Sequence, residues 1–166
     1  MKNTFLLFSF ILLNFNLFSQ EQGKKLPSVQ LKDMNGNEVN TASLGLKGPV
    51  VINFWASWCP ICKRELTTIA DVYGDWKEET GVNFVAVSVD DEKTKNGVSV
   101  LVNGKGWEYL VLMDPNGDFK RAMGVNSTPH TFLIDENGTI VYSHSGYAAG
   151  DEDILYLEIL KLTKKK

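Results

Sequence analysis

Residues 51–66 read Val-Ile-Asn-Phe-Trp-Ala-Ser-Trp-Cys-Pro-Ile-Cys-Lys-Arg-Glu-Leu, and they carry the strongest local signals in the chain. The first five residues of this stretch belong to the run Val50–Trp55, whose apolar, β-branched and aromatic residues predict a buried central strand. Pro60 marks the start of a helix, because a proline at the first helical position has no N–H to leave unpaired. Apolar residues then recur at three- and four-residue spacing, and Gly81 is expected to end the helix. The stretch therefore predicts a strand, a turn and a helix.

The chain has two cysteines, Cys59 and Cys62, at the start of this predicted helix. No disulfide can therefore join distant parts of the chain. The unpaired N–H groups and the positive end of the helix dipole stabilise a thiolate at Cys59. Cys62 follows almost one turn later, within reach of the first sulfur. We expect Cys59 to be a partly exposed nucleophile with a lowered pKa, and Cys62 to be the thiol that resolves a mixed disulfide.

Two other roles for the cysteine pair stay open. A zinc site usually needs four ligands, and only His130 and His144 could join the pair, at a separation that matches no zinc finger. A structural disulfide between such close residues would close too small a loop to stabilise the fold much. Both alternatives explain the pair less well than thiol–disulfide exchange, and no metal ligands are predicted.

The rest of the chain alternates strand-like and helix-like segments. Residues 29–31 and 38–44 flank Asn35-Gly36, a strong signal for a hairpin turn. Further along, the sequence predicts a strand at 82–89, one helix over 90–106, a strand at 109–113, a short helix ending at Gly124, a hairpin of strands 131–134 and 139–143, and a last helix over 151–162. This order predicts an α/β fold with a mixed central sheet flanked by helices.

The N-terminus has the pattern of a secretory signal peptide: Lys2, an apolar run over residues 5–18, then Ser19 and Gln20. The run is shorter than the ~20 residues of a membrane-spanning helix. We predict a signal peptide at 1–20, removed on export to the periplasm, and a soluble domain at 21–166. An uncleaved membrane anchor is the alternative. Outside the cytosol a thiol pair meets an oxidising environment.

Composition limits the partners of the chain. Its 166 residues are 43% hydrophobic and 22% charged, which excludes a disordered chain. The formal net charge of −3 argues against a nucleic-acid-binding surface. We expect a monomer. A chain of this length has enough residues to bury a core without a permanent cross-link.

Residues 124–138 read Gly-Val-Asn-Ser-Thr-Pro-His-Thr-Phe-Leu-Ile-Asp-Glu-Asn-Gly. Together with residues 51–66, this segment resembles the thioredoxin superfamily, and within it the exported TlpA/ResA-like thiol–disulfide oxidoreductases. The resemblance covers nearly all of residues 26–162. It implies a thioredoxin-like fold in which residues 29–44 form an added N-terminal β-hairpin and residues 90–106 a central helical insert. It also implies a redox-active Cys59–Cys62 disulfide and no other cofactor.

The resemblance further implies a substrate-binding groove beside the cysteines. Pro129 matches the cis-proline that faces the active-site pair, and the backbone of Thr128 would hydrogen-bond an extended substrate strand. An ordinary trans proline at a strand start is the alternative. Trp58 is expected on the substrate surface, together with the residues between the cysteines, Pro60 and Ile61.

An acidic residue beside the second cysteine is also implied. Glu65 matches the acidic residue of TlpA/ResA-like proteins, which would tune or deprotonate the Cys62 thiol. A solvated glutamate in the first helical turn is an equally weighted alternative. Asn53 stands where thioredoxin itself carries a buried aspartate, so the resemblance does not carry the proton route of thioredoxin over to this chain. Glu65 is therefore the candidate for the acid. Trp55 is expected to support the core.

The hypothesis that follows is an exported oxidoreductase that reduces protein disulfides, with a membrane thiol relay as its electron donor. Its substrates would be apocytochrome thiols in cytochrome c maturation, another oxidoreductase or misfolded proteins, and the sequence does not choose among them. A dithiol oxidase and a copper- or zinc-handling module, kept open by His130 beside Pro129, are the alternatives. A peroxidase is disfavoured because Cys59 lacks the Pro-x-x-x-Thr-x-x-Cys pattern of peroxiredoxins.

Overall fold

The computed structural model describes residues 23–164. The predicted signal peptide at 1–20 lies outside this range. Within the range, no helix combines the length and the apolar character needed to cross a membrane. The elements follow in the order β1 (Gln30–Asp33), β2 (Glu38–Asn40), the 3-10 helix η1 (Thr41–Ser43), β3 (Val50–Trp55), α1 (Pro60–Thr80), β4 (Asn83–Ser88), α2 (Asn96–Lys105), β5 (Leu110–Met113), α3 (Asp118–Ala122), β6 (His130–Ile134), β7 (Ile140–Ser145) and α4 (Asp151–Thr163).

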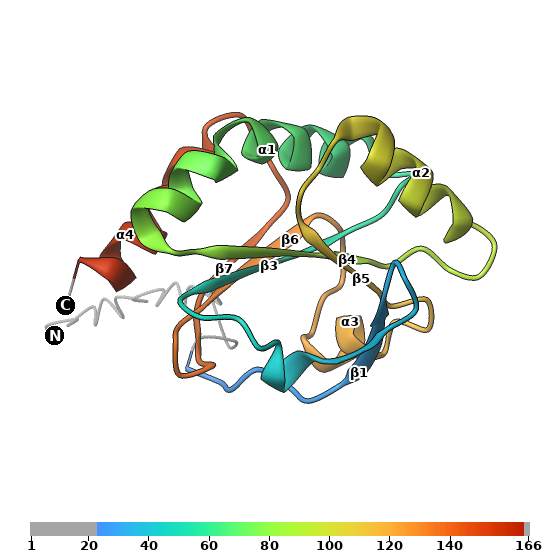
Figure 1. Cartoon of the computed structure of the whole chain (residues 1–166), viewed down its shortest axis with the longest axis horizontal. Coiled ribbons are helices and arrows are strands. Elements are labelled where there is room, and N and C mark those ends of the chain that lie inside the picture. Colours follow the sequence, from blue (N-terminus) through green and yellow to red (C-terminus); the bar gives the residue numbers. More distant parts are fainter. Residues whose placement is uncertain (1–22, 165–166) are drawn as a thin grey trace, which may run out of the picture.

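The strands form one mixed sheet in the order β2-β1-β5-β4-β3-β6-β7. The central strands β3, β4 and β5 are parallel, and the N-terminal hairpin and the β6–β7 hairpin pair antiparallel at the two sides. Helices α1 and α2 cover one face of the sheet and α3 covers the other (Figure 1). This is the predicted thioredoxin-like α/β fold, with the added N-terminal hairpin in place at the sheet edge.

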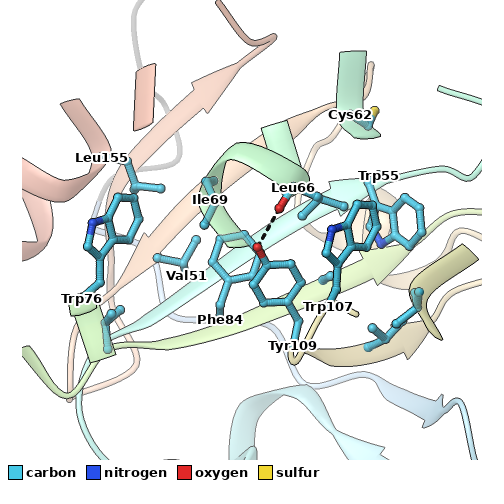
Figure 2. Packing of buried hydrophobic residues seen from close by; sticks show 14 of the residues in the cluster. Val51, Trp55, Cys62, Leu66, Ile69, Trp76, Phe84, Trp107, Tyr109 and Leu155 are labelled. Atoms are coloured by element: carbon cyan, nitrogen blue, oxygen red, sulfur yellow. Dashed lines mark hydrogen bonds between the residues drawn. The ribbon is translucent and has the colours of Figure 1, made fainter. Parts of the chain in front are cut away.

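The core lies on both faces of the central strand β3, which is buried at all six positions. Alternate side chains point to opposite faces, so Trp55 packs under α1 while Phe54 packs toward α3 with Phe119. Figure 2 shows the cluster under α1, where the hydroxyl of Tyr109 donates a hydrogen bond of 2.7 Å to the carbonyl of Leu66. As predicted, Trp55 is fully buried and supports this cluster.

Two predicted elements are shorter than expected. The strand predicted over 38–44 ends at Asn40, because Thr41 turns inward, where its hydroxyl accepts from Val29 N and donates to the Pro27 carbonyl. The helix predicted over 90–106 begins only at Asn96. Residues 92–95 form turns instead, because the Asp91 carboxylate accepts hydrogen bonds from the following backbone N–H groups. In both cases a side chain satisfies backbone donors that a regular element would otherwise use.

Candidate active site

The two cysteines lie at the N-terminus of α1, just after the turn that follows β3. Cys59 is the N-cap residue of α1, and its sulfur accepts a hydrogen bond of 3.2 Å from Cys62 N. The two sulfurs form a disulfide with a Cα–Cα separation of 5.4 Å. Pro60 occupies the first helical turn and Gly81 ends the helix in a left-handed conformation, both as predicted.

Access to the two sulfurs differs less than the sequence suggested. Cys59 is 5% exposed and Cys62 is completely buried. The prediction of a partly exposed Cys59 is therefore wrong for the disulfide form, because both cysteines belong to the buried cluster that contains Trp55 and Leu66. Figure 2 shows Cys62 in this cluster. Cys59 remains the one of the pair that reaches the surface.

The loop before β6 faces the cysteine pair. The Thr128–Pro129 peptide bond is cis, as predicted. The Thr128 carbonyl oxygen lies 4.0 Å from Cys59 Sγ, so the loop and the disulfide are brought together across 69 residues of sequence. On the other side of Cys59, Trp58 is 60% exposed and Pro60 is exposed, which leaves an open rim next to a nearly buried sulfur.

Glu65 is buried, so the alternative of a solvated glutamate is wrong. It retains 4% of its surface and accepts two hydrogen bonds, one from Asn53 Nδ2 at 2.9 Å and one from Thr131 Oγ1 at 2.9 Å. Asn53 Nδ2 also donates to Thr131 Oγ1 at 2.8 Å, which closes a three-residue ring. Glu65 lies three residues after Cys62, on the same side of α1.

Burial raises the pKa of Glu65 to about 7, against an ordinary value of 4.5. The hydrogen bonds from Thr131 and Asn53 act in the opposite direction, and the nearby carboxylates Asp151 and Glu152 raise the pKa further. A carboxyl group with a pKa near neutrality exchanges its proton readily at physiological pH. The site therefore holds a buried acid–base group one helical turn from the second cysteine.

A buried aspartate that the sequence analysis missed fixes the turn before Cys59. The Asp90 carboxylate accepts hydrogen bonds from Ser57 N at 2.8 Å and Ser57 Oγ at 2.6 Å, and a third from Ser88 Oγ at 2.8 Å. Asp90 lies two residues after the end of β4, the strand beside β3. Its place at the carboxyl end of a parallel strand is a signal that could have identified it.

The two histidines point to other partners. His130 Nε2 lies 2.8 Å from Ser143 Oγ and its ring stacks on Phe132, while His144 Nε2 lies 3.0 Å from Asp151 Oδ2. Over residues 23–164, no three His, Cys, Asp or Glu side chains gather in a way that could hold a metal ion.

The family model described as Redoxin matches residues 21–157. ResA of Bacillus subtilis (strain 168), a thiol–disulfide oxidoreductase, is 32% identical over 143 residues, which cover 86% of this chain and 78% of ResA. ResA of Halalkalibacterium halodurans is 30% identical over 139 residues, or 84% and 77% of the two chains.

Solved structures agree with the fold. The solution structure of an uncharacterised thioredoxin-like protein from Porphyromonas gingivalis is 47% identical, with a TM-score of 0.75 over 84% of this chain and 92% of that one. StoA from Bacillus subtilis shares the fold at 22% identity, with a TM-score of 0.63 over 80% and 97% of the two chains. The chain belongs to the Redoxin family, and it is a TlpA/ResA-like thiol–disulfide oxidoreductase of the thioredoxin superfamily.

Proposed function

We propose that this oxidoreductase works outside the cytosol and reduces disulfide bonds of proteins. The observation that carries the proposal is the position of the cysteine pair. Cys59 caps α1 within 4.0 Å of the Thr128 carbonyl, next to the exposed side chain of Trp58. An extended polypeptide that runs along Thr128 and Pro129 would place its own disulfide at the sulfur that reaches the surface.

The reaction begins with the reduced pair. The Cys59 thiolate, stabilised by the start of α1, attacks one sulfur of the substrate disulfide. The other substrate sulfur leaves as a thiolate, and Cys59 is joined to the substrate in a mixed disulfide. This first step needs access, which Cys59 has and the fully buried Cys62 lacks.

Resolution needs the Cys62 thiol to lose its proton. Glu65 in its carboxylate form takes this proton, and the Cys62 thiolate then attacks Cys59 Sγ and expels the second substrate thiolate. The substrate gains two electrons and becomes a dithiol, while the enzyme ends with the Cys59–Cys62 disulfide. In the reverse direction the protonated Glu65 returns the proton to the leaving Cys62 thiolate.

Continued turnover needs a thiol donor that reduces the Cys59–Cys62 disulfide again. A membrane thiol relay would serve a monomeric enzyme in the periplasm, delivered there by the predicted signal peptide at 1–20. The ResA names of the relatives support this class of reaction. Protein dithiols and disulfides, including those of apocytochromes, are the proposed substrates.

The reduction potential of the Cys59–Cys62 pair tests the direction. Equilibration of the protein with defined thiol–disulfide buffers should give a value close to the roughly −270 mV of thioredoxin. A value close to the roughly −120 mV of the oxidant DsbA would overturn the reductase and favour a dithiol oxidase. Trapping tests the roles of the sulfurs: Cys62→Ser should accumulate mixed disulfides with substrate and Cys59→Ser should not. Equal trapping by the two variants would show that the nucleophile is assigned wrongly.

A further inference from the structure

A small cavity lies between α1 and the corner formed by β7 and α4. The volume that the centre of a water molecule can occupy is about 10 Å³, so the cavity has room for about one water. Glu65 reaches it from α1, and aliphatic side chains of α1 and α4 complete the wall. The other polar residues that line it are Thr131, Tyr142, His144, Asp151 and Glu152. A water there would have the several polar partners that a buried water needs.

The cavity lies between the buried carboxyl group of Glu65 and the His144–Asp151 pair, which is partly exposed to solvent. Glu65 is 4% exposed, whereas the side chains of His144 and Asp151, which contact each other at 3.0 Å, are 38% and 20% exposed. Asp151 is fixed in place, because its Oδ2 also accepts a hydrogen bond of 2.7 Å from Ala148 N. The imidazole therefore stands at the solvent end of the cavity in a defined orientation.

The other titratable groups that face Glu65 do not replace the imidazole. Burial raises the pKa values of Tyr142 and Tyr147 above their ordinary value of 10, so both phenols stay protonated near neutral pH. Glu152 accepts hydrogen bonds from the Tyr147 hydroxyl and from Gly150 N. From β3 and β6, Glu65 is met by the amide and hydroxyl that complete its hydrogen-bonded ring. Histidine is the side chain suited to take up and release protons in this pH range.

We propose that the proton which Glu65 takes from Cys62 leaves the protein through this cavity, carried by one water molecule to the His144–Asp151 pair. Glu65 gives its proton to the water while the water passes a proton to the neutral imidazole, which releases it to solvent. The carboxylate, the water and the neutral imidazole are restored, and no electron moves. The inference rests on the proposed role of Glu65 toward Cys62. It assigns His144 as the proton acceptor at the solvent end and Asp151 as the residue that positions its imidazole, both outside the thiol chemistry.

Carbon-13 NMR of the Glu65 carboxyl in the oxidised protein tests the path directly. In the wild-type protein, rapid proton exchange should give one sharp, averaged resonance at the midpoint of the Glu65 titration. In His144→Leu, an apolar side chain closes the polar exit. Exchange then waits for local opening of the fold and should slow by at least about tenfold, so that the resonance broadens. A sharp, averaged resonance in His144→Leu would overturn the path.

The matched control is Asp153→Asn, which removes an exposed carboxylate from the same helix without touching the cavity. It should behave like the wild type. A second measurement uses the wild-type protein alone, so it does not depend on the folding of a variant. Nuclear Overhauser effects from water to the Thr131 and Leu155 methyl groups should reveal the bound water, and their absence would overturn the proposal. Neither measurement involves the cysteines, so a failure of the path is distinguishable from a failure of Glu65 as the base for Cys62.

Discussion

Asn53 on β3 and Glu65 on α1 hold each other through a hydrogen bond of 2.9 Å, with the amide donating to the carboxylate. Both side chains are buried. Where thioredoxin carries its buried aspartate on the central strand, this chain carries an amide, and the carboxyl group stands on the neighbouring helix instead. Asn53 therefore stabilises the carboxylate of Glu65 but carries no ionisable group itself. The exchange moves the proton-accepting group onto the helix that also carries Cys62.

Glu65 should make the stability of the oxidised protein depend on pH. Its folded-state pKa of about 7 lies above the ordinary value of 4.5, so the folded state favours the protonated form. This contribution is fully present below pH 4.5 and is lost as the pH rises through 7. The wild-type protein should lose about 3 kcal/mol relative to Glu65→Gln between pH 4 and pH 8.

Urea unfolding of both proteins at the two pH values measures the difference. Glu78→Gln, which changes an exposed glutamate on the same helix, should follow the wild type. If the free energy of unfolding changed with pH in the same way for the wild type and Glu65→Gln, Glu65 would not be a buried carboxyl group with a raised pKa.

Glu65→Gln should also slow the resolution step selectively. The reduced enzyme reacts with dithiobis(nitrobenzoate) in two steps, because Cys59 attack releases one coloured thiolate and Cys62 attack releases the second. We expect an unchanged first release and a second release about a hundredfold slower, the low end for a positioned acid–base group.

The pH profile separates this role from a purely structural one. In the wild type the rate of the second release should rise as Glu65 loses its proton near pH 7, and in Glu65→Gln this inflection should disappear. Stopped-flow absorbance measures both releases, with Cys62→Ser as the variant that gives only the first. A second release that is unchanged in Glu65→Gln would remove Glu65 from the reaction.

The elements that carry the site could be predicted because their signals are local. The buried run of β3, Pro60 at the helix start and Gly81 at its end are each set by residues adjacent in sequence. The prediction was wrong where one side chain turns toward the backbone, as Thr41 and Asp91 do, because propensity and periodicity carry no record of such bonds.

The environment of Glu65 could not be predicted for a different reason. The spacing places Glu65 on the same side of α1 as Cys62, and a solvated first turn fits that spacing equally well. Burial is decided by Asn53 and Thr131, which lie 12 and 66 residues away and meet Glu65 only once β3 and β6 pair. The same long-range closure creates the cavity beside α4.

Asp90 should be required for both stability and the first chemical step. Asp90→Asn replaces one carboxylate oxygen by an NH2 group, which cannot accept hydrogen bonds, so a donor of Ser57 or Ser88 loses its partner beside the fully buried Asp90 side chain. We expect a loss of about 3 kcal/mol in the free energy of unfolding. The first thiolate release should also slow, because the turn before Cys59 is no longer fixed.

The neighbouring Asp91→Asn is the matched control, since Asp91 is exposed and its bonds stay within its own turn. It should cost much less stability and leave the first release unchanged. Urea unfolding and the two-step release assay report the two effects. Equal losses for the two variants would show that the hydrogen bonds to the Ser57 turn do not matter.

Trp58→Ala should impair the reduction of protein disulfides while sparing small ones. Trp58 is 60% exposed beside Cys59, so in the free enzyme its side chain stabilises little, whereas a docked polypeptide would cover it. We expect kcat/KM for a disulfide-bonded protein to fall about tenfold, as for an aromatic contact residue of moderate importance. The free energy of unfolding should change by less than about 0.5 kcal/mol.

Val100→Ala removes a comparably exposed apolar side chain on α2, 73% exposed, and should change neither rate. Steady-state assays with a protein disulfide and with dithiobis(nitrobenzoate), run side by side, decide the matter: an equal loss of rate with both substrates would mean that Trp58 acts on the Cys59 thiol and not on the bound polypeptide.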